Sequence, residues 1–237
     1  RMEETDKNWV DFWDQQSIMD DTSWNKNMEI FMTGSQSFFD FKEDDEVLDI
    51  GSGPGFLVHY IKEQVKSICC LDTSPAFVEE GNRKFGGDSH IQFFLLGDNY
   101  LDFSMLEGKQ FSKIVCASVI QYYKDINEVN TLIREMKKYA QPSAQMLIVD
   151  IPLEAGIVKD LFGLLKTSWK QKYLTRILKF IVQSYTSEYA KIRKKTGLLT
   201  VRKEEIDRLI EDNHLTATWR SDVLTLNGAR KHLLITF

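Results

Sequence analysis

The chain has 237 residues, of which 43% are hydrophobic, and a formal net charge of -5 at pH 7. This length suits one large domain, or one domain with an insertion, and allows a substantial buried core. No apolar run approaches the roughly 18 residues that a membrane-spanning helix needs, and the acidic first residues do not resemble a secretory signal. The 3 cysteines, two of them adjacent, do not make a disulfide framework. We therefore expect a protein of the reducing cytoplasm.

The N-terminal stretch, residues 1–40, carries three of the 5 tryptophans: Trp9, Trp13 and Trp24. Aromatic residues at helical spacing more often form a packing face than a binding surface. The stretch precedes the first predicted strand. We expect it to lie outside the central sheet, where it would contribute to the choice of substrate.

A glycine-rich turn follows the first predicted strand. The sequence Val47-Leu48-Asp49-Ile50 runs into Gly51, Gly53 and Gly55, and a helical pattern begins after them. Glycine allows a positive φ and has no Cβ, so the backbone can turn tightly against a cofactor at the start of a helix. Dinucleotide-binding turns place Gly or Ala where this chain has Phe56. The turn therefore predicts a nucleotide cradle and disfavours NAD or FAD.

Strands then alternate with helices along most of the chain, which is typical of a mainly parallel sheet covered on both faces. We predict strands near residues 46–51, 67–72, 91–96, 112–118 and 144–150, and helices near 55–65, 75–84 and 126–139. In such a sheet the ligand binds at the carboxyl ends of the strands. Polar or small residues stand at these ends: Asp72 with Thr73, Asp98 with Asn99, Ala117 with Ser118, and Asp150.

The segment 153–200 has a different charge from the rest of the chain. Between Gly156 and Thr200 there are ten Lys and Arg against two Asp and Glu, so this part carries +8 and the remainder -13. Segregated positive charge indicates an anionic partner, although a solvated helical face is an equally good interpretation. Its apolar residues spread over more than one helical face, which favours a packed helical cap over an interfacial helix.

The last part of the chain predicts a helix over 203–213 and then two apolar runs, 215–226 and 232–237. Asn227-Gly228 lies between the two runs, and this pair is a strong hairpin signal. We therefore expect an antiparallel pair of strands at the end of a parallel sheet.

Taken in order, these motifs resemble the class I S-adenosylmethionine-dependent methyltransferases, with Asp49 and the glycines as the first motif of that family. The resemblance implies a three-layer Rossmann-like α/β fold: a mostly parallel seven-stranded sheet, an antiparallel C-terminal hairpin whose last strand lies beside the fifth, and a helical cap. It divides a single domain, 1–237, into an N-terminal helical lid (1–40), a cofactor-binding core (41–152), the cap (153–200), and a C-terminal helix and hairpin (201–237).

The resemblance also implies roles for the site residues. Gly51, Gly53 and Gly55 would cradle the methionine end of S-adenosylmethionine, with Asp49 near its ammonium group. The remaining cofactor contacts would be Asp72 and Thr73 for the ribose, Asp98 and Asn99 for the adenine, and Ala117 and Ser118 beside the reacting methyl group.

Two residues are candidates for catalysis. Asp150, at the end of the fifth strand, is the best carboxylate for a general base, and Tyr123 follows the fourth strand, where acceptor contacts often lie in these enzymes. The 4 histidines have no ligand spacing, and no metal motif occurs.

Absent motifs narrow the choice of acceptor. The Asn/Asp-Pro-Pro-Tyr motif of enzymes that methylate DNA bases or glutamine is missing after the fourth strand, as is the glutamate pair of protein-arginine methyltransferases. We expect a small-molecule acceptor, with nucleic acid unfavoured. Two alternatives remain: an NAD-type oxidoreductase, and a non-catalytic S-adenosylmethionine-binding protein that docks RNA or membrane through the basic cap.

Overall fold

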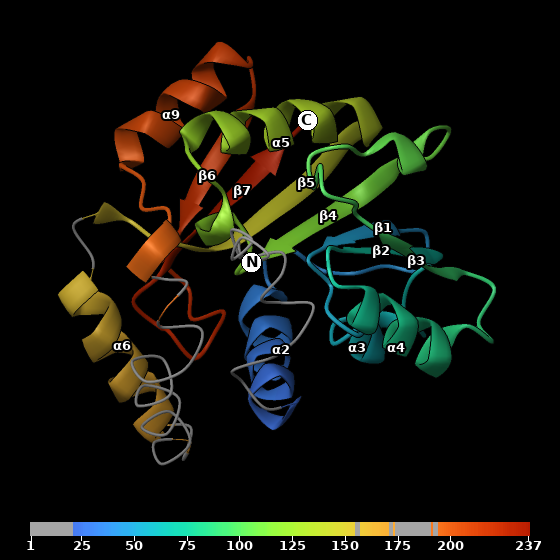
Figure 1. Cartoon of the computed structure of the whole chain (residues 1–237), viewed down its shortest axis with the longest axis horizontal. Helices are drawn as coiled ribbons and strands as arrows, with labels where there is room; N and C mark the ends of the chain where they lie inside the picture. Colours follow the sequence, from blue (N-terminus) through green and yellow to red (C-terminus); the bar gives the residue numbers. More distant parts are fainter. Residues whose placement is uncertain (1–20, 155–156, 171–172, 174–190, 192–193) are drawn as a thin grey trace, which may run out of the picture.

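The computed structural model describes residues 21–154, 157–170, 173, 191 and 194–237 (Figure 1). The described part contains one seven-stranded sheet. Its strands are β1 (Glu46–Ile50), β2 (Ser67–Asp72), β3 (Ile91–Leu95), β4 (Phe111–Ala117), β5 (Ala140–Ile151), β6 (Thr216–Arg220) and β7 (Lys231–Thr236).

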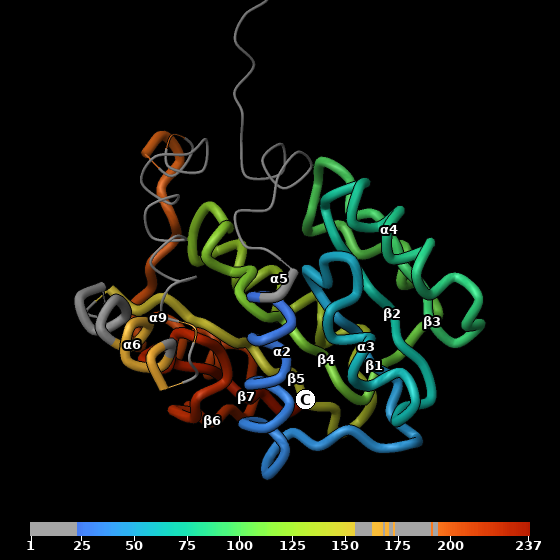
Figure 2. Tube along the Cα trace, turned by 90° about the horizontal axis from the view of Figure 1, so that it is seen from below, coloured from blue at the N-terminus to red at the C-terminus, as the bar shows by residue number. Residues whose placement is uncertain are grey.

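The strands are ordered β3-β2-β1-β4-β5-β7-β6 across the sheet. The first five are parallel to their neighbours, whereas β7 runs antiparallel to both β5 and β6. In Figure 2 this order can be followed from β6 to β3 across the molecule. The predicted fold is confirmed, including a last strand inserted beside the fifth.

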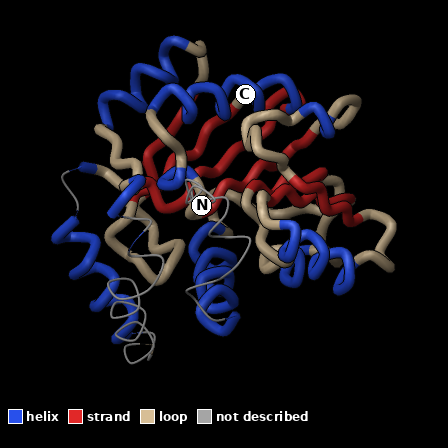
Figure 3. The backbone as a smooth tube through the Cα atoms, in the orientation of Figure 1, coloured by secondary structure: helices blue, strands red, loops and turns tan. Residues whose placement is uncertain are grey.

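Helices cover both faces of the sheet, which makes three layers (Figures 1 and 3). One face carries α5 (Ile126–Tyr139) and α9 (Lys203–Asp212), whose buried apolar residues belong to the same core cluster as Leu48 and Ile50 of β1. The other face carries α2 (Asp21–Ser35), α3 (Val58–Ile61), α4 (Pro75–Phe85) and, beyond them, α6 (Ile157–Lys170). Val47 points to this second face, because side chains alternate along a strand.

Local signals account for α4 and α5, two of the helices that the sequence predicts correctly. Pro75 occupies the first turn of α4, and the Ser74 side chain accepts the Phe77 amide hydrogen bond as an N-cap. Asp125 caps α5 in the same way, through the amides of Asn127 and Glu128. Their apolar faces then decide which side packs on the sheet.

The helix predicted over 55–65 is much shorter in the structure. Only Val58–Ile61 is helical, and turns lie on both sides of it. Hydrogen bonds of mixed spacing explain this, since Tyr60 bonds to the Leu57 carbonyl three residues back whereas Lys62 bonds to that of Val58, four residues back.

The predicted tight hairpin at Asn227-Gly228 is also wrong, although the two strands do pair. β6 ends at Arg220 and β7 begins at Lys231, so residues 221–230 form a longer connection. Leu224, Thr225 and Leu226 in this connection are buried. Burying them holds the loop against the body of the protein, where the Leu226 amide donates to Asn27 Oδ1 of α2 (2.8 Å). Burial of the loop thus outweighed the local turn signal.

No helix in the described residues has the length and apolarity to cross a membrane.

Candidate cofactor and acceptor site

A cavity of about 420 Å³ opens at the carboxyl ends of β1, β2 and β4. This is the position at which open α/β sheets bind ligands, and the volume falls within the range of small-molecule sites. Its wall is mainly apolar and aromatic, with Trp24, Phe56, Phe77, Tyr100, Tyr122 and Tyr123 contributing rings.

The glycine turn forms one part of the wall. Gly51 and Gly53 line the cavity, with φ angles of 72° and 55°. The Gly51 amide donates to the Leu71 carbonyl (2.8 Å), which ties the turn to the end of β2. A Cβ on Gly51 would lie 2.3 Å from Val119 Cγ2, so only glycine fits there. The turn therefore presents bare backbone to the cavity.

Gly55 has a different role from the one its motif implies. It is absent from the cavity wall, and a Cβ there would lie 2.8 Å from the Phe85 ring and 2.9 Å from the Phe93 ring. Its φ of 89° also favours glycine. The third glycine is needed for packing against α4 and β3, and the structure does not bring it to the cradle.

Asp72 is 8% exposed and lines the cavity, as does Thr73. Its Oδ2 accepts the Gly53 amide (2.8 Å) and its Oδ1 accepts the Ser74 amide (2.9 Å). Burial raises the pKa of this carboxyl, and the backbone hydrogen bonds oppose that rise. Asp72 thus joins the glycine turn to the start of α4, and each of its oxygens retains a lone pair for a ligand.

Asp49 lies on β1 beneath the turn, only 5% exposed, and does not line the cavity. Burial, followed by the charge of Asp72, raises its pKa to about 7. Within the described residues no hydrogen bond reaches its carboxylate. Two buried carboxylates close together favour a cation nearby, because a positive charge would offset the cost of ionising Asp49.

Asp98 and Asn99 are exposed, and neither is among the residues lining the cavity. Asn99 Oδ1 instead accepts the Leu101 amide (3.3 Å). The residues on either side, Leu96 and Tyr100, do line the cavity. The third strand end thus supplies an apolar side chain and an aromatic ring to the wall.

Ala117 and Ser118, at the end of β4, both line the cavity. Ser118 has a φ of 58°, in the left-handed region that serine rarely adopts. Its hydroxyl donates to Asp150 Oδ2 at 2.6 Å, and its amide donates to the Val149 carbonyl at 3.1 Å. The end of β4 is therefore held by the end of β5.

Asp150 does not reach the cavity wall. Its Oδ2 accepts from Ser118, and its Oδ1 accepts from the Thr225 hydroxyl at 2.8 Å. Its amide donates to His232 Nδ1 (3.1 Å) and its carbonyl accepts from Arg230 (3.3 Å). A carboxylate held in this way cannot approach an acceptor, so the expectation that Asp150 acts as a general base conflicts with its geometry.

Tyr123 does line the cavity and is 7% exposed. Its ring stacks on Tyr100 with centroids 5.5 Å apart, while the Tyr100 hydroxyl donates to Glu128 Oε2 at 2.6 Å. Burial is the main cause that holds the pKa of the Tyr123 phenol well above its ordinary value. At neutral pH Tyr123 is therefore a neutral hydroxyl and not a base.

Several cavity residues were not anticipated from the strand-end motifs. Trp24 of α2 stacks on Phe56, with ring centroids 6.0 Å apart, and both line the cavity. Lys124 follows β4, and Thr196 and Gly197 lie at the end of the charged insertion. The tryptophan-rich N-terminus and the insertion were the only sequence signals for them.

Other aromatic residues of the two outer segments lie elsewhere. Trp169 is 72% exposed, and Tyr173 packs beside Ile30 and Leu226. Trp9 and Trp13 are outside the described residues, as is Lys172, whereas Lys170 is exposed at the end of α6. Among the described residues, no group of three or more His, Cys, Asp or Glu side chains could hold a metal ion.

The cavity fits a nucleoside cofactor. It combines a backbone cradle at Gly51 and Gly53, a buried carboxylate at Asp72, and apolar walls at Ile50, Phe77 and Leu96. A ribose needs acceptors for its hydroxyls and an adenine needs apolar surfaces on which to lie, and both are present.

The strand order and the glycine turn after β1 together define a class of protein. They are those of the class I S-adenosylmethionine-dependent methyltransferase fold. Residues 48–145 match the family model described as a methyltransferase domain. The chain thus has the class I methyltransferase fold, and its central part, residues 48–145, is similar to a methyltransferase domain.

Solved structures agree on the fold. The chain is similar to a chain from the complex of the Haloferax volcanii Trm112 methyltransferase activator with the putative methyltransferase: TM-score 0.60, 13% identity, 97% of each chain covered. It is also similar to a cyclopropane-fatty-acyl-phospholipid synthase-like protein from Lactobacillus casei: TM-score 0.58, 14% identity, 96% of this chain and 98% of that chain.

A third similar structure is the N-methyltransferase NodS from Bradyrhizobium japonicum in complex with S-adenosylhomocysteine. Its TM-score is 0.54 at 17% identity, with 98% of this chain and 88% of that chain covered. No curated protein sequence matches the chain.

Proposed function

We propose that this protein transfers the methyl group of S-adenosylmethionine to a small-molecule acceptor. One observation carries the proposal: a single cavity joins the glycine turn and Asp72 to an aromatic region after β4. A methyltransferase needs such continuity, because donor and acceptor must lie in line. The methyltransferase-domain match over residues 48–145 supports the same activity.

The cofactor end is assigned as follows. The Gly51 and Gly53 backbone holds the methionine part, whose ammonium faces the negative charge of Asp49 and Asp72. The free lone pairs of Asp72 accept the ribose hydroxyls, with Thr73 beside them. Phe77, Leu96 and Tyr100 enclose the adenine, and Asp98 with Asn99 completes its outer edge when the cofactor is bound. Ala117 and Ser118 flank the reacting group.

S-adenosylmethionine supplies an electrophilic methyl group when bound. The protein then has to position the acceptor and exclude water. Trp24 and Phe56, with Thr196 and Gly197, lie where such a closure is needed. Asp72 is the one carboxylate among the described lining residues, and its two oxygens hold backbone amides. We infer that the acceptor reacts without a carboxylate base, with the Tyr123 hydroxyl as a hydrogen-bond partner.

The oxidoreductase alternative is less well supported. Phe56 stands where a dinucleotide turn needs a small residue, and its ring lines the cavity. The antiparallel β7 between β5 and β6 also differs from the strand order of dinucleotide-binding sheets.

We also propose a cytoplasmic location. The three cysteines are free and buried, as expected in a reducing compartment.

Calorimetry tests the proposal directly. Purified protein is titrated with S-adenosylmethionine, S-adenosylhomocysteine and NAD. We expect micromolar binding of S-adenosylhomocysteine, which corresponds to about -8 kcal/mol, and no binding of NAD. Methyl transfer to a metabolite panel is then followed by release of S-adenosylhomocysteine. Saturation by NAD alone would overturn the assignment, and tight cofactor binding without any transfer would favour a non-catalytic binding protein.

A further inference from the structure

Lys124 is the cationic residue of the cavity wall among the residues that the structure describes. Its amide donates to Glu128 Oε2 at 2.8 Å, which fixes the backbone at this position. The ammonium group makes no ion pair with any described residue. A lysine with a fixed backbone and an uncommitted charge at a cavity is suited to binding an anion.

Among the described residues, the charges near Lys124 do not neutralise it. Glu128 is the carboxylate bonded to the Lys124 backbone. Its Oε2 accepts hydrogen bonds from the Tyr100 hydroxyl and from the Lys124 amide, and not from the Lys124 ammonium group. Asp125 caps the start of α5 through its own side chain. Asp72, the acidic residue of the described wall, is the last residue of β2, and β1 lies between β2 and β4. The wall therefore has an acidic side at the cofactor and a basic side at the acceptor.

We propose that the acceptor carries a carboxylate or phosphate bound by Lys124, attached to an apolar or aromatic body that lies against Tyr122 and Tyr123. This rests on the proposed function and names the substrate class of the same site. In this proposal Lys124 of the cavity, and not the charged insertion, selects an anionic acceptor. Lys170, at the exposed end of α6, is not part of this wall.

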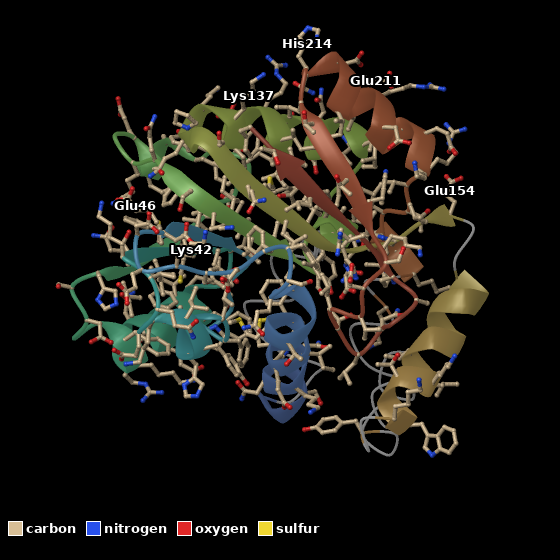
Figure 4. All side chains as sticks on the ribbon, turned by 180° about the vertical axis from the view of Figure 1, so that it is seen from behind. Lys42, Glu46, Lys137, Glu154, Glu211 and His214 are labelled. Atoms are coloured by element: carbon tan, nitrogen blue, oxygen red, sulfur yellow. The ribbon has the colours of Figure 1, made fainter. Side chains whose placement is uncertain are left out.

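The test compares wild type with Lys124→Gln, Lys124→Arg and a control, Lys42→Gln. Like Lys124, Lys42 is exposed and makes no ion pair with any described residue. Lys42 precedes Glu46, the first residue of β1 (Figure 4), whereas Lys124 follows the carboxyl end of β4. S-adenosylhomocysteine affinity is measured first and should be equal in all four proteins. Methyl transfer is then measured with pairs of acceptors, each an aromatic acid or phosphate and its neutral amide or alcohol.

We expect wild type to prefer the charged member of each pair. Lys124→Gln should raise its KM by about two- to fivefold, the scale of a partly exposed ion pair, whereas Lys124→Arg and Lys42→Gln should not. Transfer only to neutral acceptors, or equal losses in Lys124→Gln and Lys42→Gln, overturns the proposal. If the wild-type protein does not bind S-adenosylhomocysteine, the proposed function itself is overturned.

A second inference rests on an independent feature, a pair of strained residues beside the cavity. Ser118 and Asp150 have φ angles of 58° and 64° and stand at the ends of the neighbouring strands β4 and β5. Few residues other than glycine adopt this region, and those that do are usually held there by their surroundings. The 2.6 Å hydrogen bond between their side chains joins one strained residue to the other.

Further contacts hold Asp150 in place. Thr225 bonds its second oxygen, and His232 Nδ1 accepts its amide. His232 is fully buried and its Nε2 lies 3.0 Å from the Asp222 carbonyl, so the ring is neutral with its proton on Nε2. These contacts come from the connection between β6 and β7, and from β7 itself.

We infer that Asp150 is a positioning residue for the cofactor cavity. By binding the Ser118 hydroxyl it keeps Ser118 in the left-handed conformation, and this sets the backbone that Ala117 and Ser118 present to the cavity. Asp150 acts through Ser118, since it does not itself line the wall. This too rests on the proposed function, because the readout is S-adenosylhomocysteine affinity.

A rescue experiment separates this role from simple stabilisation. Asp150→Ala should weaken S-adenosylhomocysteine binding by about tenfold, the effect of losing one charge-assisted hydrogen bond. Adding Ser118→Gly should restore most of the affinity, because glycine adopts a positive φ without a partner. Asp150→Ala should also lower the melting temperature, and the double variant should not recover it, because the hydrogen bond between Thr225 and Asp150 is absent from both.

Two further variants complete the test. Thr225→Val removes a hydroxyl from Asp150 without touching Ser118, so it should lower stability and leave affinity unchanged. Asp150→Asn retains an acceptor for Ser118 and tolerates the left-handed conformation, so it should fold and bind normally. Wild-type affinity in Asp150→Ala, or no recovery on adding Ser118→Gly, overturns the inference; if Asp150→Ala does not fold, weak binding by a folded Asp150→Asn does so.

Discussion

The two ends of the cavity are built in different ways. At the proposed cofactor end, Gly51 and Gly53 follow β1 and Asp72 ends the adjacent strand β2. The Gly51 amide donates to the Leu71 carbonyl, and the Gly53 amide donates to the Asp72 carboxylate. At the proposed acceptor end, Trp24, Lys124 and Gly197 come from three segments far apart in the chain and line the same cavity. Under the proposed function, locally determined geometry serves the part that a common cofactor requires. Surfaces assembled from distant segments serve the part that has to differ between substrates.

The largest expected effect tests the rigidity of the cofactor end. Gly51→Ala places a Cβ 2.3 Å from Val119 Cγ2 at a φ of 72°. We expect loss of measurable S-adenosylhomocysteine binding and a fall of about 2–4 kcal/mol in unfolding free energy, from overpacking and backbone strain. Chemical denaturation and calorimetry measure the two. Gly87→Ala is the control, because its Cβ would meet nothing within 4 Å. Equal behaviour of the two variants would refute the special role of Gly51.

The pH dependence of stability tests whether burial raises the pKa of Asp49, so that its ionised form destabilises the folded protein. Its pKa is about 7 in the folded protein and 3.8 is the ordinary value, so the folded state binds the proton more tightly. Stability of the ligand-free protein should therefore fall as pH rises, by about 2–3 kcal/mol between pH 5 and 8. Bound S-adenosylhomocysteine should reduce this loss, because its ammonium favours the ionised carboxylate.

Asp49→Asn provides the comparison, since it should remove this contribution and be more stable than wild type at pH 8. The difference between the two proteins isolates Asp49. This matters because buried His232, whose pKa is lowered mainly by burial, gives the opposite slope: its contribution is lost as pH falls. If the unfolding free energies of wild type and Asp49→Asn change in parallel with pH, then the pKa of Asp49 is not raised in the folded protein.

Asp72→Ala should weaken both the structure and the ligand site. It removes the acceptor of the Gly53 and Ser74 amides as well as the proposed ribose contact. We expect S-adenosylhomocysteine affinity to fall by about 1.5–3 kcal/mol, with a loss of unfolding free energy of similar size. Asp98→Ala, at an exposed strand end, should leave the melting temperature unchanged. Normal affinity in Asp72→Ala would reduce its role to joining the turn to α4.

The smallest expected effect concerns the assembled acceptor end. Trp24→Ala removes a ring that stacks on Phe56, and we expect a loss of about 1 kcal/mol in acceptor binding, seen as a higher KM. The matched control is Trp169→Ala, because Trp169 is 72% exposed and outside the cavity wall. If the two variants raise KM equally, or neither does, then α2 does not contribute to the acceptor site.

The sequence predicts the core of the fold well for a physical reason. Buried parallel strands need continuous apolar runs, and the helices between them need caps and apolar faces, so β1 to β5, α4 and α5 are all visible in short windows. The Asn227-Gly228 hairpin fails because the turn signal is local, whereas burial of Leu224 and Leu226 depends on α2, far away in the chain.

The candidate site divides along the same line. Gly51, Gly53, Asp72, Thr73, Ala117 and Ser118 reach the cavity as predicted, because each stands at the carboxyl end of a parallel strand. Gly55 and Asp150 also stand near strand ends but do not reach the cavity. The rings of Phe85 and Phe93 lie against Gly55. The hydroxyls of Ser118 and Thr225 bind the carboxylate of Asp150. A motif gives the position of a residue along a strand but not the neighbours that compete for it.

The sequence by itself therefore determined the α/β class, the order of the elements and the glycine turn at the cavity, since these follow from periodicity and from the glycines after the first strand. Only the tertiary structure decided which side chains meet at the acceptor end. Trp24, Lys124 and Gly197 line one cavity although they lie far apart in the chain, and no local pattern records such an arrangement. Tertiary packing likewise separated Asp150 from the cavity by giving both of its oxygens hydroxyl partners.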